Sequence, residues 1–180
     1  MPWESVLPSG DKIPSVSEVQ IDPTLSKAQR YRDLRAALES LLEGEPDAVA
    51  NLANAAALLA QSLEGINWCG FYLLRGEELV LGPFQGKPAC VRIAVGKGVC
   101  GTAAARRTTI VVPDVNRFPG HIACDPVSRS EIVVPILQDG VLRGVLDVDA
   151  PEVERFGDED RAGLEKFVET LVPLVEWERL

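Results

Sequence analysis

The chain has 180 residues, of which 46% are hydrophobic and 25% are charged, and its formal net charge at pH 7 is −9. This length fits one domain with a full hydrophobic core. The acidic charge excludes a broad basic face that would neutralise phosphates, so we expect no binding to nucleic acid and none to an anionic membrane surface.

The N-terminal part of the sequence predicts no transmembrane or targeting segment. An apolar run of about 18 residues is absent, and the start Met1-Pro-Trp-Glu lacks the basic and apolar sections of a signal peptide. We therefore expect a cytoplasmic protein. Residues 1–23 contain four prolines and no sustained hydrophobic period, which predicts an extended N-terminal arm before a single domain over residues 24–180.

Three long helices are expected. Ser26 is a suitable N-cap for a helix whose apolar residues recur every three or four positions until Gly44. Asp47 caps a second, alanine-rich helix that ends at Gly65, and Asp158 caps a third helix near the C-terminus.

Between the second and third helices the hydrophobic period changes to two, which is typical of β-strands. The expected strands cover residues 66–75, 79–82, 91–94, 109–112, 132–137 and 141–148. A short helix over residues 99–106 and long loops over 83–89 and 114–128 connect them. This order predicts an α+β fold with a central, mostly antiparallel sheet, the N- and C-terminal helices on one side and a loop-built ligand pocket on the other.

Three carboxylates occupy the last two expected strands. Asp147 and Asp149 alternate in one strand, and Glu131 begins its neighbour. A three-residue turn with Gly140 in the left-handed conformation would set Glu131 opposite Asp147, with Asp149 diagonal on the same face, whereas a two-residue turn would put Glu131 on the reverse face. Clustered carboxylates raise one another's proton affinity and attract an ammonium group. The alternative is a solvated outer face of the sheet.

Four cysteines in a chain with a sufficient core argue against a disulfide framework and favour free, catalytic or metal-binding thiols. Cys69 is most simply a core residue, whereas Cys90, Cys100 and Cys124 lie near turns or element ends and are better explained by redox exchange. Cys100 opens the short helix, whose dipole favours a thiolate. The spacings include no C-x-x-C, which makes a zinc site weak, although His121 could serve as a further ligand.

Two aromatic residues share one face of the first expected strand. Trp68 and Tyr72 are four positions apart, which places both on the same side. They either form an aromatic wall for an apolar or sulfur-bearing ligand or pack in the core.

Six segments of the chain resemble the free methionine-(R)-sulfoxide reductases, a single-domain branch of the GAF fold. They are NWCGFY (67–72), GPFQGKPAC (82–90), GKGVCG (96–101), FPGHIACD (118–125), SEIVVPI (130–136) and LDVD (146–149). The resemblance covers residues 25–178, and only Cys69 departs from it, because a plain apolar residue is expected there. A GAF domain without the other cysteines would be an ordinary ligand sensor, which is the alternative function.

The resemblance implies an enzyme that reduces free L-methionine (R)-S-oxide and excludes residues within a protein chain. In that family the cysteine at the position of Cys124 attacks the substrate, the one at Cys90 resolves the intermediate to a disulfide, and the one at Cys100 can join a disulfide relay. An external dithiol such as thioredoxin then resets the enzyme, and no metal or other cofactor is implied. Related GAF domains often dimerise through helices, which leaves a homodimer open, but the sequence does not give the oligomeric state.

The resemblance further implies the substrate contacts. The indole packs against the substrate methyl group, backbone N–H groups of the long loop receive its carboxylate, and the three acids hold its ammonium group and the sulfoxide oxygen in a division that stays open. The implied substrate-binding residues are Trp68, Tyr72, Ile122, Ala123, Glu131, Asp147 and Asp149; the implied catalytic residues are Cys124, Cys90, Cys100, Glu131 and Asp149.

Overall fold

A computed structural model describes residues 21–180 of the chain. Its helices are α1 (Lys27–Leu42), α2 (Ala48–Ser62), α3 (Gly98–Arg106) and α4 (Asp158–Leu171), with short 3₁₀ helices at Val115–Arg117, Val172–Leu174 and Trp177–Arg179. Its strands are β1 (Trp68–Arg75), β2 (Glu78–Gln85), β3 (Arg92–Ala94), β4 (Ile110–Val112), β5 (Ser130–Gln138) and β6 (Val141–Ala150). The arm expected over residues 1–23 lies almost wholly outside the described residues, and its boundary with the domain stays a prediction.

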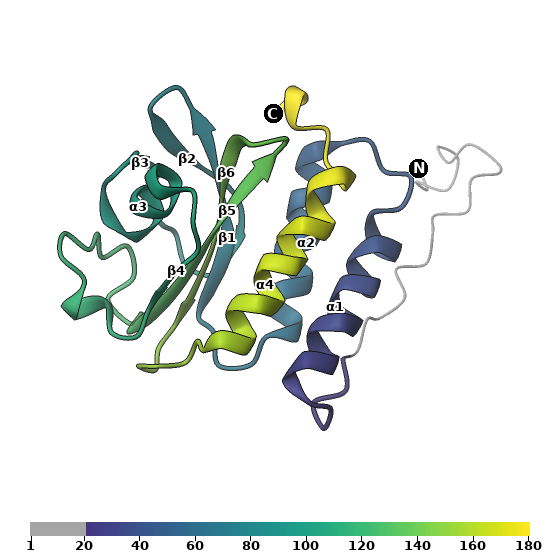
Figure 1. Cartoon of the computed structure of the whole chain (residues 1–180), viewed down its shortest axis with the longest axis horizontal. Coiled ribbons are helices and arrows are strands. Elements are labelled where there is room, and N and C mark those ends of the chain that lie inside the picture. Colours follow the sequence, from purple (N-terminus) through teal and green to yellow (C-terminus); the bar gives the residue numbers. More distant parts are fainter. Residues whose placement is uncertain (1–20) are drawn as a thin grey trace, which may run out of the picture.

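The six strands form one antiparallel sheet in the order β3-β2-β1-β6-β5-β4. Helices α1, α2 and α4 lie on one side of this sheet, and α3 lies on the other (Figure 1). The predicted α+β fold is therefore confirmed. Within residues 21–180 no helix is both long enough and apolar enough to span a bilayer.

Alternation along the strands divides the core in two. In β1, Cys69 and Phe71 pack against α1, α2 and α4, whereas Trp68 and Tyr72 pack on the α3 side. In β6, the apolar residues that alternate with the two aspartates all face the three long helices. Successive strand side chains point to opposite faces, so this alternation leaves the acids on the α3 side of the sheet.

The turn between β5 and β6 differs from the prediction. It has two residues, Asp139 and Gly140, with φ of 51° and 78°, and Gln138 pairs with Val141. Positive φ at both positions is the geometry that a two-residue hairpin turn requires, and an Asp-Gly pair is well suited to it. The expected three-residue turn is therefore wrong.

A β-bulge next to this turn preserves the predicted face. Arg143 is an extra residue without a partner in the register, and beyond it Glu131 pairs with Asp149 rather than with Asp147. Since one inserted residue reverses the side to which all later residues point, the bulge cancels the effect of the shorter turn. Glu131 therefore shares a face with both aspartates, although the register behind that prediction was wrong.

Strand β2 extends into the segment expected to be a loop. Phe84 pairs with Gly70 of β1, and its ring stacks on Trp68 with 5.4 Å between ring centroids. A Cβ atom at Gly70 would lie 2.3 Å from the Cβ atom of Phe84, so this close pairing requires a glycine. Residues 86–91 connect β2 to β3, so the loop begins and ends later than the expected 83–89.

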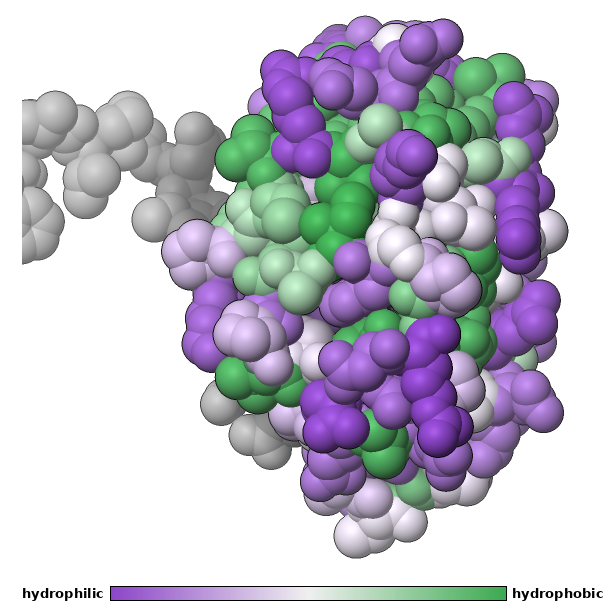
Figure 2. Space-filling model, turned by 90° about the vertical axis from the view of Figure 1, so that its left-hand side faces the viewer, coloured by the Kyte–Doolittle hydropathy of each residue, from purple (hydrophilic) through white to green (hydrophobic). Residues whose placement is uncertain are grey.

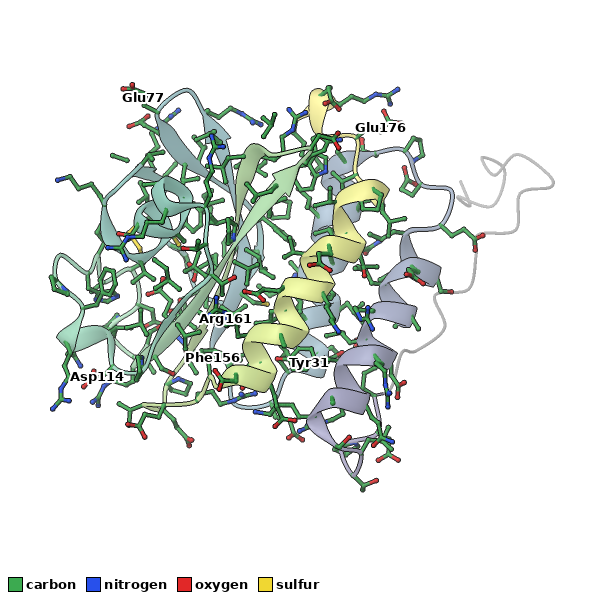
Figure 3. All side chains as sticks on the ribbon, viewed as in Figure 1. Tyr31, Glu77, Asp114, Phe156, Arg161 and Glu176 are labelled. Atoms are coloured by element: carbon green, nitrogen blue, oxygen red, sulfur yellow. A yellow bond between two sulfur atoms is a disulfide. The ribbon has the colours of Figure 1, made fainter. Side chains whose placement is uncertain are left out.

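Helix α4 begins one residue earlier than expected and is tied to α1. Its N-cap is Gly157 rather than Asp158, because Asp160 Oδ2 accepts the backbone N–H of Gly157 at 3.0 Å. The buried Asp160 carboxylate also accepts the Tyr31 hydroxyl at 3.0 Å and pairs with Lys27 Nζ at 2.8 Å. Tyr31 lies between α1 and α4 (Figure 3).

The Tyr31 ring fits against Gly163 of α4, where a Cβ atom would lie 2.3 Å from the ring. We expect Gly163→Ala to lower the free energy of unfolding by about 1–3 kcal/mol, as overpacked cores do. Helix propensity alone would give the opposite sign, by about 1 kcal/mol. Urea denaturation measures the difference. In a Tyr31→Ala background the same substitution should be neutral or stabilising; an equal loss in both backgrounds would contradict this account.

Candidate active site

A pocket opens on the α3 side of the sheet, beneath the loop that joins β4 to β5. It contains about 530 Å³ of space not filled by protein atoms, part of it open to solvent. The predicted site residues that line it are Trp68, Tyr72, Cys100, Ile122, Cys124, Glu131, Asp147 and Asp149. Ala123 is exposed and does not line it. Figure 2 views the molecule from this side, where hydrophobic and hydrophilic residues are interspersed.

A disulfide joins Cys90 to Cys124 at this pocket, with 5.6 Å between their Cα atoms. The first cysteine lies between β2 and β3, and the second lies in the long loop before β5, so the bond links two separate loops. Cys69 is fully buried on the opposite face of the sheet, near the carbonyl oxygen of Ala56, which confirms it as a core residue. Two of the three predicted redox cysteines are therefore bonded to each other.

The two aromatic residues hold the loop that carries Cys90. The Tyr72 hydroxyl donates to the carbonyl oxygen of Cys90 at 2.9 Å, and Trp68 Nε1 donates to the carbonyl oxygen of Lys87 at 3.1 Å. Gly86 has φ of 132°, and a Cβ atom there would lie 2.5 Å from the indole. Trp68 and Tyr72 therefore form a pocket wall and also anchor one cysteine loop.

Asp125 anchors the loop that carries Cys124. Its carboxylate accepts the backbone N–H of Val127 at 3.0 Å, Asn67 Nδ2 at 3.3 Å and Lys87 Nζ at 3.4 Å. The backbone N–H of Val127 is the main reason why the pKa of Asp125 is lowered. Because Lys87 lies in the other cysteine loop, this contact joins the two loops independently of the disulfide. The roles of Asp125, Asn67 and Lys87 were not predicted from the sequence. The only signal for them was that each lies in one of the segments that carry the cysteines.

The three acids share the pocket without a lysine or arginine partner. Glu131 is 5% exposed and Asp147 is 6% exposed, and Asp149 pairs with Glu131 across the strands. Among residues 21–180 the one basic side chain within ion-pair distance of these acids is His121, whose Nε2 lies 3.8 Å from Glu131 Oε2. Burial lowers the pKa of His121, which favours its neutral form. The cluster therefore lacks a fixed compensating charge.

This environment raises the pKa values of all three acids. Burial is the main cause for Glu131, followed by the charges of Asp147 and Asp149, and its pKa lies well above the ordinary value. The pKa of Asp149 is likewise well above the ordinary value, through burial and then Asp147, and burial raises the pKa of Asp147 to about 6. Raised pKa values favour the protonated form, most strongly for Glu131 and Asp149, and a cation bound beside these acids would favour loss of their protons.

Cys100 lies in the first turn of α3, but its expected thiolate character is wrong. Its thiol is 4% exposed, and it donates to Glu131 Oε1 at 3.9 Å. Burial and then the charges of Asp147 and Glu131 raise the pKa of this thiol well above its ordinary value. Desolvation and neighbouring carboxylates therefore outweigh the helix dipole, and Cys100 is a neutral donor in this state.

The Asp125 anchor predicts an unequal response to two substitutions. We expect Asp125→Ala to lower the free energy of unfolding by about 1–3 kcal/mol, because it leaves half-buried donors without an acceptor. Lys87→Met should cost less than about 1 kcal/mol, since the lysine side chain is 64% exposed. Chemical denaturation of the disulfide form measures both, and equal losses would contradict this account of the loop.

The sequence matches the family described as "GAF domain" over residues 47–172. A free methionine-R-sulfoxide reductase of Escherichia coli (strain K12) is 52% identical over 147 residues, which are 82% of this chain and 89% of that protein. The protein of the same name from Saccharomyces cerevisiae is 45% identical over 161 residues, which are 85% of this chain and 89% of that protein.

Solved structures agree with this match. The free methionine-R-sulfoxide reductase from Neisseria meningitidis, solved in complex with its substrate, superposes with a TM-score of 0.84 at 45% identity, over 89% of this chain and 96% of that one. The fRMsr of Staphylococcus aureus, in its reduced form, has a TM-score of 0.78 at 54% identity, over 81% and 94% of the two chains. The chain therefore belongs to the GAF domain family and, within it, to the free methionine-R-sulfoxide reductases.

Proposed function

We propose that this protein reduces free L-methionine (R)-S-oxide to L-methionine and oxidises two of its own thiols in doing so. The observation that carries this proposal is the Cys90–Cys124 disulfide at the edge of a pocket that contains an indole and three acids, of which Glu131 and Asp147 are buried. A redox pair beside a site suited to an amino acid favours an enzyme over a module that only binds a ligand. Family membership supports the same reaction.

The acids would recognise the α-ammonium group of a free amino acid. Asp147 and Asp149 lie on one strand face with no lysine or arginine partner among the described residues, so a ligand cation would stabilise their ionised forms. In a peptide this nitrogen is an uncharged amide and would leave the carboxylates unpaired. The backbone N–H groups of Ile122, Ala123 and Cys124 would receive the substrate carboxylate. Both contacts favour the free amino acid over a residue in a chain.

Glu131 is the best candidate for the proton donor to the sulfoxide oxygen. Its pKa is raised well above the ordinary value, so it retains a proton near neutral pH. Asp147, whose pKa is about 6, would be largely ionised there and would pair with the ammonium group. Trp68 would then contact the substrate methyl group. The pocket would thus hold the sulfoxide oxygen, the methyl group and the amino-acid end of the substrate at three separate places. This arrangement would distinguish the R from the S epimer.

The reaction then balances with two thiols. The Cys124 thiolate attacks the sulfoxide sulfur while the oxygen takes up a proton, which forms a transient sulfur–sulfur bond. The oxygen then passes to the Cys124 sulfur as this bond and the substrate's sulfur–oxygen bond break, so methionine leaves and Cys124 becomes a sulfenic acid. The Cys90 thiol attacks that sulfenic sulfur, a disulfide forms and water leaves. The two thiols thus supply the two electrons that reduce the sulfoxide. The disulfide form described above corresponds to the enzyme after this step.

The disulfide must be reduced before another cycle. A dithiol such as thioredoxin can do this by exchange, and Cys100 would pass the disulfide on if it moved to reach Cys90 or Cys124. This requirement suits a reducing compartment such as the cytosol. A homodimer that packs through helices is compatible with the proposal but is not needed by any step.

An assay of separated epimers tests the proposal. With dithiothreitol as reductant, we expect the protein to consume the R epimer of free methionine sulfoxide and to leave the S epimer and peptide-bound methionine sulfoxide unchanged. Cys124→Ser should abolish methionine formation, because the attacking sulfur is absent. Without added reductant, Cys90→Ser should still form about one methionine per chain, because attack precedes resolution. Cys69→Ser, far from the pocket, serves as a control and should retain activity.

Two results would reject the proposal. One is multiple turnover by Cys124→Ser. The other is equal consumption of both epimers by the unaltered protein, because a site that holds oxygen, methyl group and ammonium separately cannot accept both alike. If the protein binds L-methionine but consumes neither epimer, the sensor function replaces the enzyme.

A further inference from the structure

The pocket contains a group of atoms that could ligate a metal ion, and the proposed reaction does not use them as metal ligands. Cys100, Glu131 and Asp147 each offer one atom, a thiol sulfur or a carboxylate oxygen, and these atoms all lie within 4.8 Å of one another. They come from α3, β5 and β6, which are separate in the sequence. We refer to these three residues as the thiol–carboxylate cluster. All three are buried.

One atom of this cluster has no partner. Asp147 is only 6% exposed, and its Oδ1 atom is buried. No hydrogen-bond donor among the described residues reaches this oxygen. A buried carboxylate oxygen without a donor costs free energy unless something supplies a positive charge or a proton. Since Asp147 lines the pocket, a small cation that enters the pocket can reach this oxygen.

The donor set decides which cation fits. One sulfur and two carboxylate oxygens are a poor site for Mg²⁺ or Ca²⁺, which prefer oxygen ligands alone. Zn²⁺ and Co²⁺ accept sulfur and oxygen together, and three protein ligands with one open position are common for zinc. His121 Nε2, 3.8 Å from Glu131 Oε2, lies close enough to support the carboxylate or to approach the ion as a fourth ligand. The absence of C-x-x-C excluded only a site built from cysteines close in sequence.

We propose that the thiol–carboxylate cluster binds one zinc-like divalent cation in the disulfide form of the protein. On binding, Cys100 loses its thiol proton to solvent, and its sulfur bonds to the metal. Neither Cys90 nor Cys124 can compete for the ion in this form, because both are consumed in the disulfide. Cys69 lies on the other face of the sheet. Cys100 is therefore the one cysteine that can contribute a ligand to this site.

The same position has a consequence for catalysis, and this step rests on the proposed function. A cation at Asp147 and Glu131 would occupy the place of the substrate ammonium group and would remove the proton donor. Metal and substrate should therefore exclude each other. Zinc bound to the disulfide form would then compete with L-methionine for the pocket, and EDTA would reverse this competition.

Cobalt binding tests the site without methionine sulfoxide, so the outcome does not depend on the proposed reaction. The disulfide form, treated with EDTA and desalted, is titrated with CoCl₂ while its absorption spectrum is recorded. We expect one Co²⁺ per chain and a thiolate-to-cobalt charge-transfer band that added Zn²⁺ abolishes. Cys100→Ser should remove the band. Cys69→Ser, which alters the other buried thiol, should retain it.

A second variant tests the carboxylate ligand while the thiol remains. In Asp147→Asn the band should persist, but the dissociation constant for Co²⁺ should rise at least about tenfold, since even partners outside the ligand shell have effects of that size. Circular dichroism checks that each variant is folded. If Cys100→Ser does not fold, the result for Asp147→Asn decides between the outcomes. No band at one equivalent, a band that survives in Cys100→Ser, or an unchanged dissociation constant in Asp147→Asn would overturn the proposal.

Discussion

Three acids share one face of the sheet with no lysine or arginine beside them among residues 21–180, and the site depends on this constraint. Placing Glu131, Asp147 and Asp149 in the core would be costly if they remained ionised. Burial raises the pKa values of all three acids. Protonation then reduces the cost of placing them in the pocket. A site of this kind is suited to a ligand that brings its own positive charge and consumes a proton.

The fold provides this arrangement through its two unlike faces. The face toward α1, α2 and α4 is largely apolar and supplies the larger core, which stabilises the sheet. Within residues 21–180 the other face is covered by α3 and by loops, among them the two that carry Cys90 and Cys124 (Figure 1). The disulfide and the Asp125 anchor join these loops, and Tyr72 and Trp68 fix one of them to the sheet. Stability and reactivity are therefore separated across the sheet.

Much of this was predictable because it depends on local sequence. The caps Ser26 and Asp47 place the first two helices correctly, and the alternation of β1 assigns Cys69 and Trp68 to opposite faces. The cysteines near element ends pointed to the pocket, and two of them form its disulfide.

The remaining features depend on long-range packing. The Asp139-Gly140 pair is a local signal for the two-residue turn, but the bulge at Arg143 that compensates for this turn is not visible without the partner strand. The raised pKa of Cys100 reflects its burial and then two carboxylates more than 30 residues away in sequence. The same holds for the Asp125 anchor, whose donors come from two other segments, and for the thiol–carboxylate cluster. Sequence spacing could not bring these groups together.

The central claim is that Glu131 and Asp149 are protonated in the free protein at neutral pH, and that a ligand ammonium group displaces the proton of Asp149. Infrared difference spectroscopy at neutral pH, on adding L-methionine to the protein, measures the carbonyl stretch of protonated carboxyl groups directly. We expect this band in the free protein, a loss of its intensity when L-methionine binds, and a smaller loss in Asp149→Asn. A free protein without protonated carboxyl groups at neutral pH, or a band that ligand binding leaves unchanged, would contradict the account.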